Sequence, residues 1–458
     1  MKIVILGAGQ VGSTVASALV HEDNDITIVD INEARLKELQ DQMDIRCVHG
    51  HASYPKVLER AGIEDADLVI ALTNSDEVNM VACQIAYTLY NVPTRVARVR
   101  ASEYTERPEL FHREHSPVDV LISPELLLTQ YIARLIEYPG ALQVMDFADG
   151  RAQLVATEAE AGGLLVGHKL RSLRNHLPAN SDARVAAIYR KGQLVLPEGD
   201  TVIEENDLVF FLAAKRHITA VMKELRPTDS PIRRVILAGG GNIGKNLAKR
   251  LERDHHVKII ERDPVRAEAI AEELSKTIVL VGDCADANLL REESVEHADV
   301  YCALTNDDEA NILSALQAKR MGAKKVIAII NRVSYVDLME SGAIDIAVSP
   351  QQITIGSLLT HIRRGNMVRV HSLRRGAAEA IEAIALGDRR SSKVVGRSLE
   401  ELNLPKGTTI GAIVRGEDVI IAHHDTVIEE HDHVLLFVPD KKQIHAVERL
   451  FQVSATFI

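Results

Sequence analysis

Short apolar runs alternate with amphipathic stretches from residue 2 to Ser123. The apolar runs are KIVIL, DITIVD, IRCV, ADLVIALT and TRVARVR, which begin at residues 2, 25, 45, 66 and 94. The stretches between them, such as NEARLKELQDQ at 32–42, carry apolar residues at the spacing of one helix face. Strands that alternate with helices predict right-handed βαβ crossovers, and therefore a parallel, doubly wound sheet.

The pattern changes after Ser123-Pro124. The segment ELLLTQYIARLIEYPG is apolar-periodic and predicts a helix that ends at Pro139-Gly140. Strand-like runs follow, namely ALQVMDF, AQLVAT, RVAAIYRKGQLVLP and DLVFFLA. A last helical stretch, HITAVMKEL, leads to RPTDSPIR, whose prolines mark a domain boundary. We therefore predict a small α+β domain behind the parallel-sheet domain.

The same order of segments occurs twice along the chain. VILGAGQVG at 4–12 returns as VILAGGGNIG at 235–244, and ADLVIALTNSDEVN at 66–79 returns as ADVYCALTNDDEAN at 298–311. Ser123-Pro124 returns as Ser349-Pro350, and GDTVIEENDLVFF at 199–211 returns as HDTVIEEHDHVLLF at 424–437. Four blocks in one order, with slowly drifting spacing, indicate two copies of one unit.

The chain is therefore predicted to be α/β, with two tandem copies of a Rossmann-like doubly wound parallel-sheet domain, each followed by a small α+β domain. We place the Rossmann-like domains at 1–123 and 232–350, and the small domains at 140–225 and 365–453. The apolar-periodic connectors at 123–139 and 349–364 are expected to be helices.

The stretch VILAGGGNIGK at 235–245 fits two kinds of phosphate-binding loop. Gly239-x-x-x-x-Gly244-Lys245 nearly spells a P-loop, which would indicate an NTPase. A P-loop needs Ser or Thr after the lysine to hold Mg²⁺, however, and Asn246 stands there. The first copy also has Ser13 in place of the lysine. We therefore interpret both turns as G-x-G-x-x-G dinucleotide turns.

The context of each glycine turn supports this interpretation. Each turn follows an apolar strand, opens a helix, and is followed by a second strand that ends in an acid, Asp30 or Glu261. The glycines permit the tight turn, the close approach of a pyrophosphate and the packing of helix on strand. The carboxylate accepts hydrogen bonds from the ribose hydroxyls and repels a 2′-phosphate, which favours NAD(H) over NADP(H). ATP and ADP share that ribose.

Other candidates lie where the remaining strands are expected to end. Thr73-Asn74 and Thr305-Asn306 could meet ribose or phosphate, or could cap the helix that follows. Arg98 is expected to point toward phosphates, or else to be a solvated arginine, and Ile329 replaces it in the second copy.

A further difference follows the third strand. Asp283 is expected near the adenine of the second copy, and His51 replaces it in the first. The two sites are therefore expected to differ in affinity or in preferred ligand.

Composition excludes several classes of function. The net charge of −12, with 3% aromatic residues and no tryptophan, argues against a nucleic-acid partner. No apolar stretch is long enough to span a bilayer, and Met1 runs directly into a strand rather than a signal peptide. Four cysteines without C-x-x-C fit a reducing cytoplasm, where we expect them to be buried.

The chain shows binding motifs but no catalytic set. We find no Ser/His/Asp elbow, no Cys/His pair in context and no metal-ligand spacing, so neither catalytic nor metal residues are predicted. The acids shared by VIEEND at 202–207 and VIEEHD at 427–432 are interpreted as a solvated turn, or alternatively as an effector contact. Two binding units without a catalytic domain favour a sensor over an enzyme.

Several of these segments together resemble the RCK (KTN plus TrkA-C) family. They are MKIVILGAGQVGSTVASAL, IVDINEARL, ALTNSDEVNM, ARVR, VGHKLRSL and DTVIEENDLVFF, and the resemblance covers essentially the whole chain. The family's binding positions, with the third glycine of each fingerprint, fall on Gly7, Ala8, Gly9, Gln10, Val11, Gly12, Asp30, Thr73, Asn74 and Arg98. In the second copy they fall on Gly239, Gly240, Gly241, Asn242, Ile243, Gly244, Glu261, Thr305 and Asn306.

The resemblance implies a regulatory role. It implies a homo-oligomeric gating ring that binds NAD(H), responds to ATP or ADP, and sits under a potassium-translocating membrane protein. Such a ring is peripheral, on the cytoplasmic side of the inner membrane. In the family the helix after the sheet crosses to a neighbouring unit, and the small domains pair. The alternatives are an NAD-dependent oxidoreductase and an NAD(H) redox sensor that acts on another partner, such as a repressor.

Overall fold

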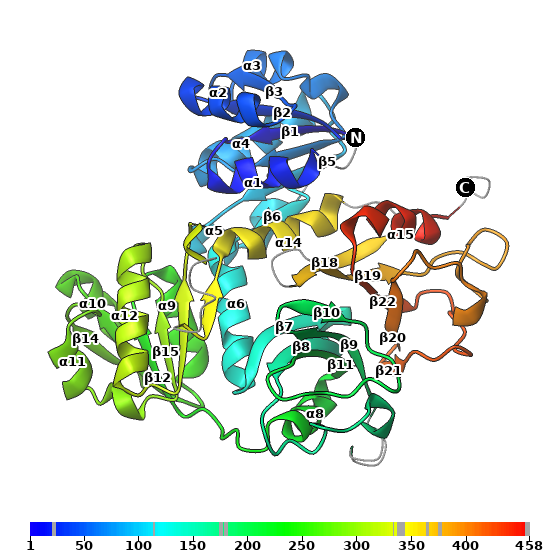
Figure 1. The fold of residues 1–458 in the computed structure, drawn as a ribbon. Coiled ribbons are helices and arrows are strands. Elements are labelled where there is room, and N and C mark those ends of the chain that lie inside the picture. The colour runs from blue at the N-terminus through cyan, green and yellow to red at the C-terminus, as the bar shows by residue number, and fades with distance from the viewer. Residues whose placement is uncertain are drawn as a thin grey trace. The chain divides into compact units, whose positions relative to one another are not determined.

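The computed structural model describes residues 1–20, 24–112, 115–173, 177, 182–332, 334–336, 344–362, 366–373 and 378–453 (Figure 1). Two compact units divide the chain. The first comprises residues 1–128 together with 350–362, and the second comprises 129–349 together with the chain beyond 362. Each unit contains a six-stranded parallel sheet, and the second also contains two five-stranded antiparallel sheets.

The first parallel sheet has the strand order β3-β2-β1-β4-β5-β6. Its strands are β1 Lys2–Leu6, β2 Asp25–Asp30, β3 Arg46–His49, β4 Leu68–Ala71, β5 Thr94–Arg98 and β6 Val120–Ile122. The helices between them are α1 Gln10–Leu19, α2 Glu33–Gln42, α3 Pro55–Arg60, α4 Asp76–Thr88 and α5 Ser102–Thr105. Because helices cover both faces, the central strands are buried along most of their length and read as continuous apolar runs.

The second parallel sheet repeats this order as β14-β13-β12-β15-β16-β17. Its strands are β12 Arg234–Ala238, β13 His256–Glu261, β14 Ile278–Val281, β15 Val300–Ala303, β16 Lys325–Ile329 and β17 Ile346–Val348. Its helices are α9 Asn242–Leu251, α10 Pro264–Glu273, α11 Ala287–Glu292 and α12 Asp308–Met321. The predicted fold class is confirmed. In the first sheet only the short sixth strand, β6, was not among the predicted apolar runs.

Among the described residues, each of the two small domains forms an antiparallel sheet with one α-helix. The first has strands β7 Ala141–Phe147, β8 Ala152–Glu158, β9 Ala183–Arg190, β10 Gln193–Val195 and β11 Leu208–Ala214, and helix α8 Ile218–Leu225. The second has strands β18 Met367–Leu373, β19 Ala378–Ile384, β20 Thr409–Arg415, β21 Asp418–Ile421 and β22 His433–Val438, and helix α15 Ile444–Phe451.

The two antiparallel sheets share one hydrophobic core. Phe147 and Phe210 from the first sheet belong to the same buried cluster as Leu373 and Phe437 from the second. A buried carboxylate also joins them, because Glu382 accepts a hydrogen bond from the Ala148 amide over 2.9 Å. The small domains of one chain therefore pack as a pair.

The acids of the two VIEE segments have a structural role. Arg190 donates to both carboxylate oxygens of Asp207, at 2.9 and 2.8 Å, and Arg415 does the same to Asp432. Both aspartates are buried, at 1% and 0% exposure. The interpretation as a solvated turn is therefore wrong for these two residues, which form a paired, bidentate contact that closes the loop before β11 or β22.

Two connecting helices follow the parallel sheets. The first, α6 Pro124–Glu137, falls partly in each compact unit, and the second, α14 Pro350–Ile362, belongs to the unit of the first sheet. There α14 packs against α1 and β6 (Figure 1). Residues 363 and 364 of the predicted second connector lie outside the described residues.

A buried lysine anchors the end of α6 within the second unit. Lys325, the first residue of β16, donates from Nζ to the carbonyls of Leu135, Pro139 and Ala141 at 3.1, 3.0 and 2.8 Å. The last carbonyls of a helix have no intrahelical partner, and a cation there also meets the negative end of the helix dipole. Burial lowers the pKa of Lys325 from its ordinary 10.5 to about 8.

Replacing Lys325 by methionine should change how stability depends on pH. Between pH 8 and 10.5 the unfolded chain keeps a proton that folded Lys325 has released, so this lysine makes stability rise with pH in that window. Urea unfolding of the wild type and Lys325→Met at pH 7.5 to 10 should therefore show a shallower rise in the variant. Lys276→Met, at an exposed position of the same parallel-sheet domain, is the control, and equal slopes for all three proteins would contradict the account.

Candidate functional site

The two glycine turns have nearly identical backbone geometry. The first glycines, Gly7 and Gly239, have φ of 111° and 113°, in the region that favours glycine. A Cβ on the third glycine, Gly12 or Gly244, would lie 1.9 or 2.0 Å from the carbonyl oxygen of the first. Helix and turn are thus in direct contact, and no side chain fits between them.

The second glycine of each turn has free space beside its Cα instead. A Cβ on Gly9 or Gly241 would have no atom within 4 Å. Gly9 is the N-cap of α1, with no side-chain cap and no acid in the first turn of the helix, and Gly241 is the same for α9. The helix N–H groups therefore lack an anionic partner from their own helix. A ligand phosphate can satisfy them and meet the positive end of the dipole.

The acid at the end of the second strand lies directly on the turn. Asp30 accepts from the Ala8 amide at 2.6 Å with one oxygen and from the Asn32 amide at 2.8 Å with the other. Glu261 accepts from the Gly240 amide at 2.9 Å and from Asp263 at 2.9 Å. Each carboxylate thus fixes the turn, and it lies beside the glycines where the fingerprint places the adenosine ribose.

Thr73 and Thr305 lie at the ends of β4 and β15 in matching networks. The Thr73 amide and hydroxyl both donate to Asn79 Oδ1, at 2.9 and 2.7 Å, and Thr305 donates to Asn311 over the same distances. Asn79 and Asn311 are completely buried. Sequence analysis missed these two asparagines, although each ends a repeated block.

The interpretation of Thr-Asn as a helix cap is wrong by one or two residues. The N-caps of α4 and α12 are Ser75 and Asp307, whose side chains accept from Val78 and Ala310 amides. Thr73 and Thr305 instead join the ends of β4 and β15 to α4 and α12 through their hydrogen bonds to the buried asparagines. The Asn74 carbonyl accepts from the Arg100 guanidinium, and the structure gives Asn306 no comparable arginine contact among the described residues.

Arg98 ends β5, beside β4 in the sheet. Burial is the main cause that lowers the pKa of its guanidinium, followed by the neighbouring charge of Arg100. Its Nε has no hydrogen-bond partner among the described residues. The corresponding Ile329 is 2% exposed and apolar, so this part of the second site lacks a cation.

The two copies also differ beyond the third strand. His51 stacks on Tyr54 with ring centroids 4.7 Å apart, and its Nδ1 lies 3.0 Å from Ser53 Oγ. In the second copy the Asp283 carboxylate accepts from the Ala285 amide at 2.8 Å. The first copy thus has an aromatic pair at the position where the second copy has an acid. Tyr54, 59% exposed, was missed by sequence analysis.

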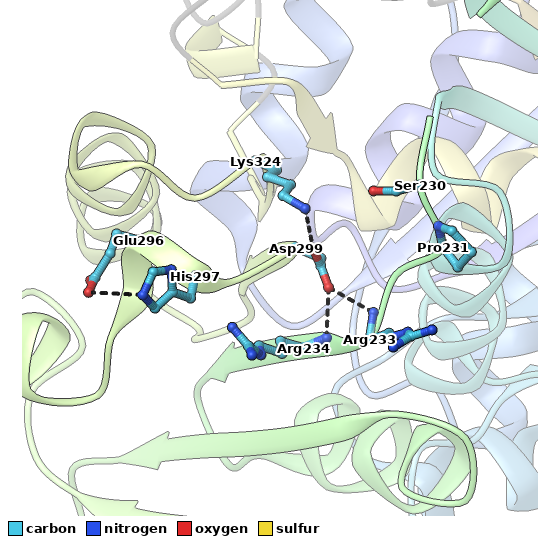
Figure 2. Close-up of a pocket in the computed structure, with 8 residues that line it drawn as sticks. All are labelled: Ser230, Pro231, Arg233, Arg234, Glu296, His297, Asp299 and Lys324. Atoms are coloured by element: carbon cyan, nitrogen blue, oxygen red, sulfur yellow. Dashed lines mark hydrogen bonds and ion pairs between the residues drawn. The ribbon is translucent and has the colours of Figure 1, made fainter. Parts of the chain in front are cut away.

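A cavity of about 400 Å³ lies at the opposite end of the second sheet, and Figure 2 shows its lining. Asp299 accepts from the amides of Arg233 and Arg234 and from Lys324 Nζ, which ties the starts of β12, β15 and β16 together. In the first copy Asp67 accepts from the Lys2 amide in the same way. This cavity lies away from the glycine turn, and its central contact is a strand tie common to both copies.

In the part of the chain that the structure describes, no cluster of three or more His, Cys, Asp or Glu side chains is arranged to hold a metal ion. None of the helices found among these residues has the length and apolar character needed to cross a membrane. Burial raises the pKa of Cys83 and Cys302 to about 12, so both thiols behave as small apolar side chains.

Comparison with known proteins adds to this geometry. The TrkA-N domain model matches residues 3–124 and 235–350, and the TrkA-C domain model matches 155–226 and 389–452. The Trk system potassium uptake protein TrkA of Halomonas elongata is 60% identical over 457 residues, which cover 100% of each chain. The same protein of Vibrio alginolyticus is 59% identical over 459 residues, again covering 100% of each.

Among solved structures, the GsuK channel bound to NAD superposes with a TM-score of 0.60 at 19% identity. The match covers 98% of this chain and 79% of that one. At this identity the likeness shows the fold, with its two Rossmann-like and two small domains.

Substituting the second and third glycines should separate stability from binding. Gly12→Ala places a methyl group against the Gly7 carbonyl, so we expect a lower melting temperature and loss of NADH binding at the first turn, with the second turn unaffected. Gly9→Ala has room in the folded protein, so the melting temperature should hold while NADH affinity falls about tenfold, because the methyl group meets the phosphates. Calorimetry and thermal melts measure both. Equal binding by Gly9→Ala and wild type would argue against phosphates at this turn.

Proposed function

We propose a function on the premise that this chain belongs to the TrkA family, the tandem TrkA-N and TrkA-C proteins of Trk potassium uptake systems. In this proposal the chain is a regulatory subunit that binds NAD(H), and also ATP or ADP, at its two glycine turns. It gates the potassium-translocating membrane subunit of a Trk system from the cytoplasmic side of the inner membrane. It acts there as a peripheral homo-oligomeric ring rather than as an enzyme.

The observation that carries the proposal is the pair of glycine turns. Each combines an uncapped helix N-terminus, an open second glycine and a carboxylate placed on the turn. Phosphates fit the helix terminus and a ribose fits the carboxylate, and this combination suits an adenine dinucleotide or adenine nucleotide. That a GsuK channel of the same fold was solved bound to NAD is in keeping with it.

Duplication supports regulation over turnover. Both copies keep the turn and the Thr–Asn network, whereas Arg98 and His51 occur in the first copy only. Two sites of unequal affinity on one chain allow the protein to respond to two nucleotides, or to two concentrations of one nucleotide. Binding would then shift a ring of a few chains between two states, to the extent that the nucleotide prefers one of them.

The alternatives lead to different observations. An NAD-dependent oxidoreductase would oxidise NADH with a substrate, and it needs a base and a substrate clamp beside the nicotinamide. A redox sensor acting on another partner would bind NADH but would not co-purify with a potassium-translocating membrane protein. Purification of the tagged chain from detergent-solubilised membranes, followed by identification of its partner, separates both from the proposed role.

Asp30→Asn should weaken the coupling of nucleotide to potassium flux. The amide oxygen can still accept one N–H of the turn, but the negative charge that binds the ribose hydroxyls is lost, so NADH affinity should fall about tenfold to a hundredfold. Potassium flux through the reconstituted complex should then lose the part of its nucleotide response that the first turn contributes. Asp25→Asn, at the exposed start of the same strand, is the matched control. Flux indifferent to nucleotide in the wild type would sink the proposal.

A further inference from the structure

Helix α14, which follows the sheet of the second copy in sequence, packs against the helix that begins at the first glycine turn. By sequence it belongs to the second copy, yet it forms part of the compact unit of the first sheet, where it packs against α1 and β6 (Figure 1). Helix α1 begins at the first glycine turn. The second copy therefore supplies an element beside the phosphate-binding end of the first.

One side-chain hydrogen bond makes this contact specific. Gln351, the second residue of α14, donates from Nε2 to Gln10 Oε1 over 2.9 Å, across 341 residues of sequence. Gln351 is buried, at 6% exposure, whereas Gln10 is exposed at the first position of α1. The backbone N–H of Gln10 belongs to the uncapped helix end. Gln351 thus fixes the side chain of a residue that stands where phosphates are expected.

The residue at this helix position differs in charge between the copies. Gln351 and Glu125 both follow a Ser-Pro pair at the start of a connecting helix. Glu125 is a half-buried acid, and burial raises its pKa while the nearby Arg98 opposes that shift. A carboxylate at position 351 would face the phosphates of a nucleotide on the first turn and repel them. A neutral amide avoids that repulsion and also donates a hydrogen bond.

We propose that Gln351 is a positioning residue of the first nucleotide site, contributed by the second copy, that holds Gln10 in the orientation compatible with nucleotide phosphates. The inference rests on the proposed nucleotide site and deepens it. Affinity at the first turn then depends on how α14 is seated.

The test uses the full chain with Gly241→Ala, which weakens binding at the second turn so that NADH titration reports the first. Gln351→Glu should weaken NADH binding about fivefold to tenfold at about 0.1 M KCl, and the loss should shrink at about 1 M KCl, because salt screens the added charge. Gln351→Met, which only removes the amide, should weaken binding about twofold to threefold at both salt concentrations. A purely structural defect would not follow salt in this way.

Gln352→Glu serves as the matched control, because it adds the same charge one residue further around α14. It should retain the affinity of the parent, and thermal melts should confirm that all variants fold. Affinity equal to the parent's for both Gln351 variants at both salt concentrations would overturn the inference alone. Failure of the Gly241→Ala parent to bind NADH, ADP or ATP would overturn the proposed first site and the inference with it.

Discussion

The contact between the third glycine and the first determines how the rest of the site is built. Because a Cβ on Gly12 would lie 1.9 Å from the Gly7 carbonyl, only glycine lets helix α1 start so close to the end of β1. This closeness aims the helix N–H groups at the carboxyl edge of the sheet. It also brings the Ala8 amide onto the Asp30 carboxylate. A backbone contact thus places a positive helix end and a negative carboxylate side by side, as an adenosine phosphate requires.

The same scaffold carries different side chains in the two copies. The turn, the acid and the buried asparagine are common to both, so their geometry is part of the fold. In the first copy Arg98 ends β5 and the His51–Tyr54 pair follows β3, and apolar Ile329 and acidic Asp283 stand at the equivalent places of the second copy. A shared backbone geometry with different neighbouring side chains suits a protein that responds to more than one nucleotide, because each copy can have its own affinity.

Local sequence patterns predicted the parallel sheets, the small domains and the glycine turns, because period, strand–turn–helix order and glycine spacing are all short-range signals. They did not predict contacts that depend on the folded arrangement. Asn79 looked like one polar residue of a helix, and its bonds to Thr73 and to the Arg98 carbonyl appear only once β4 and β5 are adjacent. Lys325 and Gln351 likewise contact residues that are 184 to 190 and 341 positions away. The helix cap was misplaced because Thr, Asn and Ser are all good capping residues.

The number of nucleotides bound per chain tests the central claim most directly. Native mass spectrometry of the full chain, titrated with NADH and with ATP, counts them. The account predicts up to two nucleotides per chain, filled at different concentrations. Gly9→Ala should raise the concentration that fills one site about tenfold, and Gly241→Ala should do the same for the other. A chain that binds neither nucleotide, or that keeps the same occupancy when both second glycines are replaced, would contradict it.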